Sequence, residues 1–181
     1  LGKTLEHYKR RDIAKYLIAL FGGPIEKFAM QQCEALITFS RFHAAHLAAI
    51  DRIPPPKIHV VPNGVDMEAF KPSNPPSALR GRYGVEGVTI GYCGRIVYLK
   101  GIDTLLKALA IVKKRYEGVR LLLVGDFPEH PEGHWREMVK GLGLEGNVVF
   151  VGGLKDDELP GAYRSFDIYC QLTAPVYGFE I

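Results

Sequence analysis

Short apolar runs alternate with longer amphipathic segments in the second half of the chain, and this alternation limits the fold more than any other feature. Apolar residues stand side by side in most of the runs, so both faces of each predicted strand are buried, as in a parallel sheet. The segments between the runs have helical spacing. We therefore predict βαβ units and an α/β fold with a parallel sheet. The predicted strands are residues 58–61, 88–93, 119–124, 147–151 and 167–170, and the predicted helices lie near residues 75–83, 101–116, 133–142 and 156–165.

The first part of the chain predicts a smaller set of elements. Residues 3–20 and 24–35 are expected to be helices, with Pro24 just inside the start of the second one. A short strand over residues 35–39 follows, and Ser40 is placed to cap a helix that runs to about Ile50.

Three consecutive prolines, Pro54 to Pro56, cannot form a helix or a central strand. They mark the expected boundary, with residues 1–52 in one domain, residues 53–56 as a linker, and residues 57–181 in a second domain.

The composition is that of a soluble globular protein, with 47% hydrophobic and 24% charged residues among 181. No run approaches the roughly 20 apolar residues that span a bilayer. The net charge of +3 comes from residues 1–52, which hold eight Lys or Arg and five Asp or Glu. This excess is interpreted as a solvated helix face, with weak attraction to an anionic membrane surface as the alternative. No basic stripe with aromatic residues is present, so no nucleic-acid partner is expected.

Cysteines and histidines give no metal or disulfide pattern. Cys33, Cys93 and Cys170 form no even framework, and we expect them to act as small buried apolar residues in a reducing cytoplasm. His43 and His46 stand at helical spacing without a third ligand, so no metal site is expected.

Residues 141–146 match the G-x-G-x-x-G pattern of dinucleotide-binding loops. They follow a predicted helix and precede a predicted strand, which is the reverse of the required order. We interpret them as a helix end and a turn into the next strand.

An anion site is predicted after the strand at residues 88–93. Gly94 allows a turn there, Arg95 and Lys100 follow, and Gly101 opens a helix. A guanidinium, an ammonium and the free N–H groups of a helix start all favour an anion, and a phosphate fits best. Parallel sheets bind ligands beyond the carboxyl ends of their strands, where Gly125 and Gly152 also lie.

Six short strings in fixed order carry a family resemblance. They are ALITFS (35–40), KIHVVPNGVD (57–66), GR before KG (94–101), LLLVG (121–125), VFVG (149–152), and DIYC running into PVYGFEI (167–181). The chain resembles the retaining glycosyltransferases of family 4, which have the GT-B fold of two Rossmann-like domains. The resemblance implies that residues 1–52 end an acceptor domain and that residues 57–181 form part of a donor domain. Both ends look like cuts, so a fragment is expected.

The resemblance also implies roles for single residues. Arg95 and Lys100 match the basic pair on the donor diphosphate and are the expected catalytic residues. The expected donor contacts are Gly94, Gly125, Gly153, Leu154, Gly178, Phe179 and Glu180. Asn63 and Gly64 match a turn that faces the cleft, and a plain turn explains them equally well.

The final motif departs from the family pattern. Tyr177 stands where family members have a glutamate that contacts the donor sugar, and Glu180 stands where they have a glycine. A tyrosine hydroxyl, with a pKa near 10, cannot replace a carboxylate at neutral pH. Direct contact between a glutamate and the sugar is therefore in doubt.

The implied function is transfer of a hexose from a nucleotide-sugar to an acceptor hydroxyl, with retention of configuration and without a metal or other cofactor. The acceptor is a sugar, a lipid-linked molecule or a small molecule, and the location is cytoplasmic, with peripheral membrane contact as an option. Polysaccharide biosynthesis fits this activity. Two alternatives remain open, which are a non-catalytic sugar-nucleotide-binding protein and a GT-B nucleotide-sugar epimerase.

Overall fold

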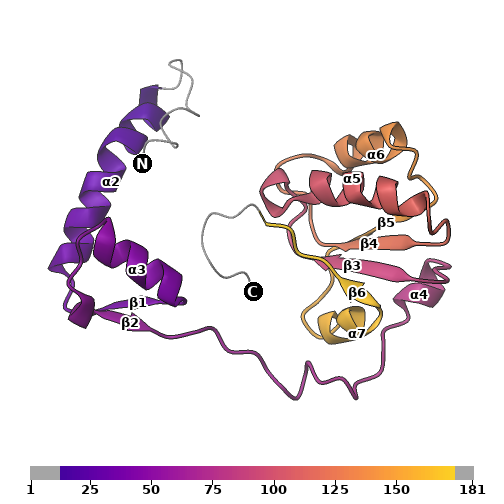
Figure 1. Ribbon diagram of the computed structural model, residues 1–181, viewed down its shortest axis with the longest axis horizontal. Helices are drawn as coiled ribbons and strands as arrows, with labels where there is room; N and C mark the ends of the chain where they lie inside the picture. Colours follow the sequence, from indigo (N-terminus) through magenta and orange to yellow (C-terminus); the bar gives the residue numbers. More distant parts are fainter. Residues whose placement is uncertain (1–12, 174–181) are drawn as a thin grey trace. The chain divides into compact units, whose positions relative to one another are not determined.

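A computed structural model describes residues 13–173 of the chain (Figure 1). The chain divides into two compact units between Gly64 and Val65. Each unit has its own parallel sheet. The predicted α/β fold class is confirmed.

The first unit is a small βαβ arrangement preceded by a long helix. Helix α2 (Ile13–Gln32) leads to strand β1 (Leu36–Thr38), helix α3 (Arg41–Ala49), the short 3₁₀ turn η1 (Pro55–Lys57) and strand β2 (Ile58–Val60). Strands β1 and β2 pair in parallel, with Leu36 opposite Ile58. The predicted cap of α3 is confirmed, since the Ser40 hydroxyl accepts a hydrogen bond from the His43 N–H at 3.1 Å.

The expected helix start at Pro24 is wrong, because Pro24 lies inside α2. A proline in a helix removes one backbone hydrogen bond and crowds the preceding residue. Here the preceding residue is Gly23, which has no Cβ to clash with the proline ring. The helix therefore continues through this position, while residues 1–12 lie outside the described part of the chain.

The linker expected at residues 53–56 does not separate the two units. The three prolines lie within the first unit, where they connect α3 to β2 through the turn η1. Strand β2 pairs with β1 rather than with the sheet that follows, so the division comes later, after Gly64. A proline-rich turn suits a short connection within a domain as well as a linker, and strand pairing decides between the two.

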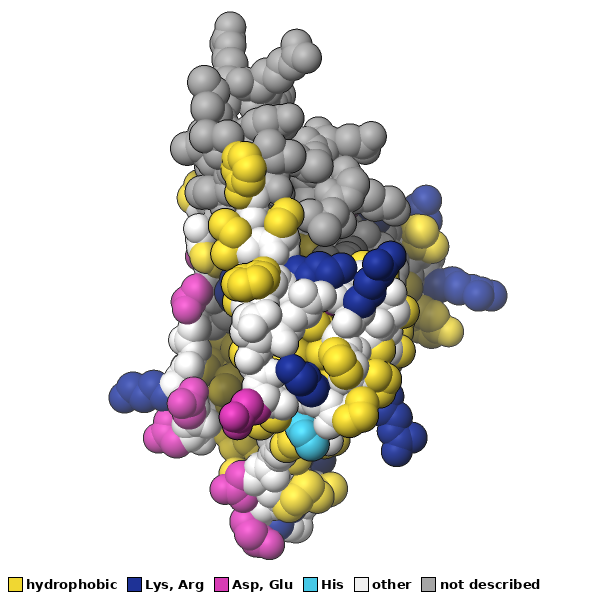
Figure 2. All heavy atoms as spheres, turned by 90° about the vertical axis from the view of Figure 1, so that its left-hand side faces the viewer, with side chains coloured by type: hydrophobic (Ala, Val, Ile, Leu, Met, Phe, Trp, Pro, Cys, Tyr) yellow, Lys and Arg dark blue, Asp and Glu magenta, His cyan; other side chains and the backbone are white. Residues whose placement is uncertain are grey.

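Many hydrophobic side chains of the first unit remain exposed (Figure 2). Leu47 and Ile53 are buried, with 6% and 1% of their surface exposed. The exposed side chains lie on α2, on α3 and along the two strands, and they are Phe21, Ile25, Phe28, Ile37, Phe39, Phe42, Ile50, Val60 and Val61. Among the described residues, this unit thus has a large apolar surface beside a small core.

The second unit holds a four-stranded parallel sheet with the order β5-β4-β3-β6. Its strands are β3 (Thr89–Cys93), β4 (Arg120–Val124), β5 (Val148–Gly152) and β6 (Ile168–Tyr169). The helices between them are α5 (Ile102–Lys113), α6 (Glu132–Gly141) and α7 (Leu159–Arg164), and α4 (Leu79–Arg82) precedes β3. The alternation of strands and helices predicted from the sequence is confirmed.

Helices cover both faces of this sheet (Figure 1). Leu121 and Leu123 of β4 point into the larger core, which α5 and α6 close with Leu106 and Trp135. Leu122, between them, points into a smaller core with Leu79 of α4 and Ala162 of α7. Side chains alternate between the faces of a strand, so a strand buried on both faces needs consecutive apolar residues. This requirement explains the apolar run of β4.

Some local predictions need correction. Helices α4 and α7 are shorter than expected, since α4 begins at Leu79 and α7 at Leu159. Cys33 is exposed, whereas Cys93 and Cys170 are partly buried. The interpretation of residues 141–146 is confirmed, since α6 ends at Gly141 and β5 begins two residues after the segment.

Candidate functional site

Three loops lie together at the carboxyl edge of the four-stranded sheet. They follow the neighbouring strands β3, β4 and β5, and backbone hydrogen bonds join them. The Gly94 N–H donates to Val124 O at 2.9 Å, and the Gly125 N–H donates to Gly152 O at 2.8 Å. The sheet ladder is thus extended into the loops, which fixes their backbones relative to one another.

Glycine is required where two of these loops touch. A Cβ at Gly125 would lie 1.9 Å from Gly94 O, and φ at Gly125 is +141°. A Cβ at Gly153 would lie 2.7 Å from a carboxylate oxygen of Asp126. The structure thus brings together Gly94, Gly125 and Gly153, three of the predicted site residues.

Arg95 extends from the loop between β3 and α5. The Tyr92 hydroxyl donates to Arg95 O at 2.8 Å, and the next residues, Ile96 and Val97, are 0% and 1% exposed. The Arg95 backbone is therefore held from both sides. Its side chain is exposed and makes no ion pair or hydrogen bond within residues 13–173, so the guanidinium is available to an anion.

Lys100 ends the 3₁₀ turn η2 (Tyr98–Lys100), directly before α5. Gly101 joins the turn to the helix in a left-handed conformation with φ of +69°, where glycine costs least. A Cβ at Gly101 would also lie 2.2 Å from Leu172 O. The loop therefore carries two cations and the start of a twelve-residue helix, as predicted for an anion site.

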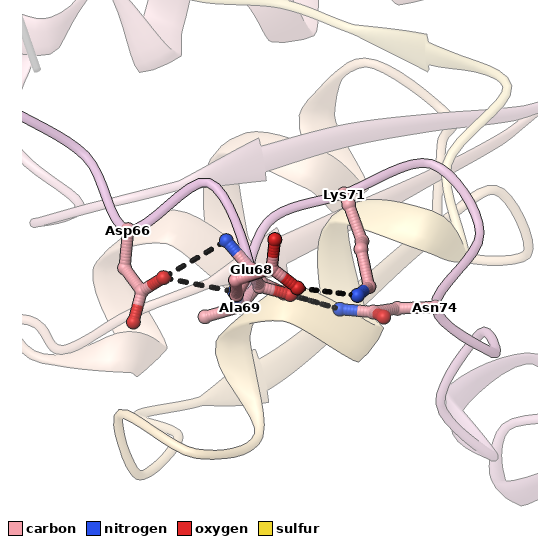
Figure 3. Close-up of polar contacts among 5 residues, drawn as sticks. All are labelled: Asp66, Glu68, Ala69, Lys71 and Asn74. Carbon is pink, nitrogen blue, oxygen red and sulfur yellow. Dashed lines mark hydrogen bonds and ion pairs between the residues drawn. The ribbon is translucent and has the colours of Figure 1, made fainter.

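The segment that enters the second unit is folded by its own polar side chains (Figure 3). Asp66 Oδ1 accepts hydrogen bonds from the N–H groups of Glu68 and Ala69 at 2.9 and 3.1 Å. The Asn74 amide donates to the carbonyl oxygens of Glu68 and Ala69, and Lys71 pairs with Glu68 at 2.6 Å. These bonds form a tight turn that shapes one wall of a cavity.

A cavity of about 660 Å³ lies between this segment, α4, α7 and the loop after β5. Leu154, a predicted donor contact, is one of its lining residues. Asp156 and Asp157 also line the cavity. The sequence predicted that a helix begins at these two residues, but α7 begins only at Leu159. The whole lining is Ala69, Phe70, Asn74, Pro75, Pro76, Ser77, Ala78, Leu79, Arg82, Leu154, Asp156, Asp157, Glu158, Pro160 and Gly161.

Other predicted site residues do not lie in the three loops at the carboxyl edge of the sheet or in the cavity. Asn63 and Gly64 are exposed and extended rather than in a turn, and neither has a positive φ. The pair has a local preference for a turn, but residues 61–66 are exposed throughout, so no packing supports one here. Gly178, Phe179 and Glu180, and the atypical Tyr177, lie outside the described residues.

The Cys93 thiol, at the carboxyl end of β3, is a poor nucleophile at neutral pH. Burial raises the pKa of the Cys93 thiol to about 12, and a hydrogen bond with Tyr163 offsets only part of this effect. The thiol therefore stays protonated at neutral pH, whereas a nucleophilic cysteine needs the thiolate.

His43 bonds to the Thr38 hydroxyl at 2.9 Å, and no group of three or more possible metal ligands occurs within residues 13–173.

Asp126 is a site residue that the sequence did not reveal. Its carbonyl accepts the Ile96 N–H at 2.9 Å, and its carboxylate faces Gly153. It thereby links the loops after β3, β4 and β5. Its place directly after Gly125, at the end of an apolar strand, is the sequence signal that could have identified it.

Among the helices that the structure describes, none is long and apolar enough to cross a membrane.

Comparison with known families identifies the chain. The profile of the family described as "Glycosyl transferases group 1" matches residues 87–180, and that of "Glycosyltransferase Family 4" matches residues 4–69. The first match covers more than half of the chain, and the chain belongs to this glycosyltransferase family. Its fold is of the GT-B class, as its structural neighbours are.

Two curated relatives illustrate the similarity. The D-inositol 3-phosphate glycosyltransferase of Segniliparus rotundus is 33% identical over 87% of this chain and 35% of its own length. A GDP-mannose-dependent α-(1-6)-phosphatidylinositol monomannoside mannosyltransferase of Mycobacterium tuberculosis is 34% identical over 64% of this chain and 30% of its own length. The chain spans about a third of the length of these relatives.

Solved structures agree with the fold. A glycosyltransferase from Rickettsia africae has a TM-score of 0.68 at 26% identity, over 79% of this chain and 40% of its own. Anabaena Alr3699/HepE in complex with UDP-glucose has a TM-score of 0.72 at 23% identity, over 83% of this chain and 41% of its own. At that identity the second match shows the fold alone.

Proposed function

We propose that this chain carries the nucleotide-sugar site of a glycosyltransferase that moves a hexose to an acceptor hydroxyl with retention of configuration. The observation that carries the proposal is the carboxyl edge of the sheet. There the backbones of Gly94 and Gly125 touch, and Gly153 packs against the Asp126 side chain. The same edge carries Arg95, whose guanidinium has no partner within residues 13–173. A close-packed glycine edge next to a free cation suits a ligand with a diphosphate group.

The chemistry requires positive charge at this place. A sugar-nucleotide loses a nucleoside diphosphate, and negative charge grows on the leaving oxygen as the glycosidic bond breaks. Groups already aimed at that charge stabilise the transition state. We assign this role to Arg95 and Lys100, which makes a metal ion unnecessary. The acceptor oxygen bonds to the anomeric carbon on the face that the diphosphate leaves, which retains the configuration. The bond from that carbon to the phosphate oxygen breaks, and the departing phosphate takes the proton of the acceptor hydroxyl.

The nucleoside is placed towards the loop after β5. Leu154 lies at the end of that loop and lines the cavity, so a base or ribose that reaches past Gly153 meets a partly apolar wall. The name of the Mycobacterium relative specifies GDP-mannose, and the Anabaena structure contains UDP-glucose. Both a guanine and a uracil nucleotide are therefore candidate donors. The acceptor is a sugar, a lipid-linked molecule or a small molecule.

Titration of the purified chain with UDP and GDP tests the donor site. We expect at least one of the two nucleotides to bind. Arg95→Ala and Lys100→Ala are each expected to weaken the affinity for that nucleotide about 10–100-fold, since each removes a charged partner of the phosphates. Lys114→Ala is the matched control, because Lys114 is exposed at the far end of α5. Equal affinity in all three variants would refute the assignment.

In a protein with transferase activity that contains this chain, the same two substitutions are expected to reduce turnover about 10²–10³-fold. This magnitude is the loss of turnover seen in other enzymes when one hydrogen-bond donor is removed from a site that stabilises negative charge in the transition state. Near-normal turnover of Lys100→Ala would exclude Lys100 from the leaving-group site.

A non-catalytic binding protein is the second candidate, and Tyr177 favours it, since a phenol replaces the expected carboxylate. The two functions differ in an assay of the protein with a labelled nucleotide-sugar. A transferase moves the label to an acceptor, an epimerase changes the free nucleotide-sugar, and a binding protein leaves it intact.

A further inference from the structure

Tyr98 connects the loop after β3 to helix α6. Its hydroxyl lies 2.7 Å from Nε2 of His134, within hydrogen-bonding distance. Its ring lies 4.9 Å from the Trp135 ring and 5.4 Å from the His130 ring, between centroids. Tyr98 and His134 are 36 positions apart in the sequence, so only the fold brings them together.

The α6 side of this contact is firmly held. The Trp135 side chain is 0% exposed and belongs to the larger core, which fixes the start of α6 against the sheet. His130 and His134 stack with their ring centroids 4.7 Å apart and their planes at 28°. The imidazole that meets the Tyr98 hydroxyl is therefore held by its neighbours.

The loop side of the contact is a short turn that ends at Lys100. Only two backbone hydrogen bonds within the loop define η2, from the Lys100 N–H to Val97 O at 3.1 Å and from the Gly101 N–H to Tyr98 O at 2.9 Å. Such 3₁₀ turns have poorer hydrogen-bond geometry than an α-helix. A side-chain anchor on Tyr98 thus fixes the first residue of the turn whose last residue is Lys100.

We propose that Tyr98 and His134 are positioning residues for the donor site. Their hydrogen bond, together with the packing of Tyr98 on Trp135, holds η2 in the conformation that presents Lys100 to the diphosphate. The inference rests on the proposed function, since it assigns Lys100 to the phosphates. In this proposal neither Tyr98 nor His134 contacts the nucleotide-sugar. Both residues act indirectly, because they hold the backbone of η2 and thereby the position of Lys100.

The directional part of the contact can be removed without loss of the ring. Tyr98→Phe keeps the packing on Trp135 and deletes the hydroxyl, and His134→Leu deletes the ring nitrogen that faces this hydroxyl. His134→Gln replaces the imidazole with another polar group that can bond to the hydroxyl. Tyr116→Phe is the matched control, because Tyr116 is 63% exposed and its hydroxyl has no partner within residues 13–173.

Two readouts are measured for each variant. Amide hydrogen exchange at Lys100 and Gly101 reports the stability of the turn, and titration with UDP and GDP reports the site. We expect Tyr98→Phe and His134→Leu to speed exchange at these two amides and to weaken nucleotide binding, each about three- to tenfold, the size expected for one hydrogen bond. His134→Gln is expected to recover most of both losses. Emission of Trp135, the single tryptophan, verifies that each variant is folded.

The outcomes separate this inference from the proposed function. Unchanged exchange in folded Tyr98→Phe would show that the contact does not hold the turn. Faster exchange with unchanged nucleotide affinity would show that binding does not depend on the conformation of η2. Each of these two results would overturn the inference. A wild-type chain that binds neither nucleotide would instead refute the donor site itself, and with it the role of the contact in binding. The exchange measurement needs no nucleotide and still decides whether the contact holds the turn.

Discussion

At the scale of single residues, the Gly94 backbone leaves no room for a side chain at Gly125. An alanine Cβ at position 125 would lie 1.9 Å from Gly94 O, at a φ of +141° that side chains rarely adopt. We expect Gly125→Ala to lower the free energy of unfolding by at least about 2 kcal/mol, since backbone strain of this kind alone costs about 1–3 kcal/mol. Urea denaturation measures the change.

Gly118→Ala is the control for this substitution. A Cβ at Gly118 would have no atom within 4 Å, and its φ is not positive. We expect its unfolding midpoint to stay near that of the wild type. Equal midpoints for the two variants would show that the edge of the sheet can shift to accept a side chain.

The sequence predicted which glycines lie at the carboxyl edge of the sheet, but it did not predict every contact there, and the reason is physical. Gly94, Gly125 and Gly153 follow apolar runs, and a glycine at the end of a buried parallel strand lies at the ligand-binding edge in any such sheet. Asn63 and Gly64 were expected to turn from the family resemblance and from their local preference, and the structure has no turn there. Asp126 was missed because its role depends on contacts with two other loops.

At the scale of elements, an ion pair fastens α4 to β6 at the amino edge of the sheet. Asp167 accepts the Thr89 N–H at 2.8 Å and pairs with Arg80. The Thr89 hydrogen bond, with a smaller contribution from Arg80, lowers the pKa of the Asp167 carboxyl below its ordinary value. A carboxyl with a lowered pKa in the folded state adds stability above its unfolded pKa of about 3.9 and loses it as the pH falls through the folded value.

We therefore expect Asp167→Asn to destabilise the chain at pH 7 and to destabilise it progressively less as the pH falls below the unfolded pKa of about 3.9. The measurement is the thermal unfolding midpoint of wild type and variant from pH 2 to pH 7. Glu145→Gln serves as control, because Glu145 is exposed and has no partner within residues 13–173. A constant difference between Asp167→Asn and wild type across this pH range would show that the carboxylate charge is not involved.

The sequence predicted where the strands and helices lie along the chain, but it did not predict which strands pair with each other. The run around Leu121 to Leu123 predicts a strand buried on both faces, because consecutive apolar residues need cover on each side. Nothing in the run around Ile58 tells whether it pairs with residues 36–38 or with the later sheet. The pairing depends on contacts between distant segments, and it moved the boundary past the three prolines.

At the scale of the whole molecule, residues 61–66 join the two units as an exposed segment without secondary structure. Proteases cut where the backbone is exposed and unpaired. We expect brief thermolysin treatment to cut first before Val65, and mass spectrometry to show a resistant product that starts there. A first cut within β3 or β4 would contradict the division into two units.

The chain by itself is expected to show no sugar transfer, even where it binds a nucleotide. Orientation of the two reactants supplies about 7–11 kcal/mol of catalysis in well-ordered sites. The chain spans about a third of the length of its curated relatives, so it offers few residues besides the proposed donor site to orient an acceptor. An assay with labelled UDP-glucose and GDP-mannose, in the presence of a small-molecule acceptor, measures transfer. Labelled product from the chain alone would contradict the expectation.

The sequence by itself determined the class of the fold and the place, after one of its strands, of the loop that carries Arg95 and Lys100. Apolar runs that alternate with amphipathic helices can bury their faces only as a covered parallel sheet, and the loop from Gly94 to Gly101 follows one of its strands. Only the tertiary structure decided which strands pair, where the units divide, and that Tyr98 meets His134. The reason is physical, since periodicity reports which face of a segment is buried, whereas pairing and side-chain contacts depend on segments far apart in the chain.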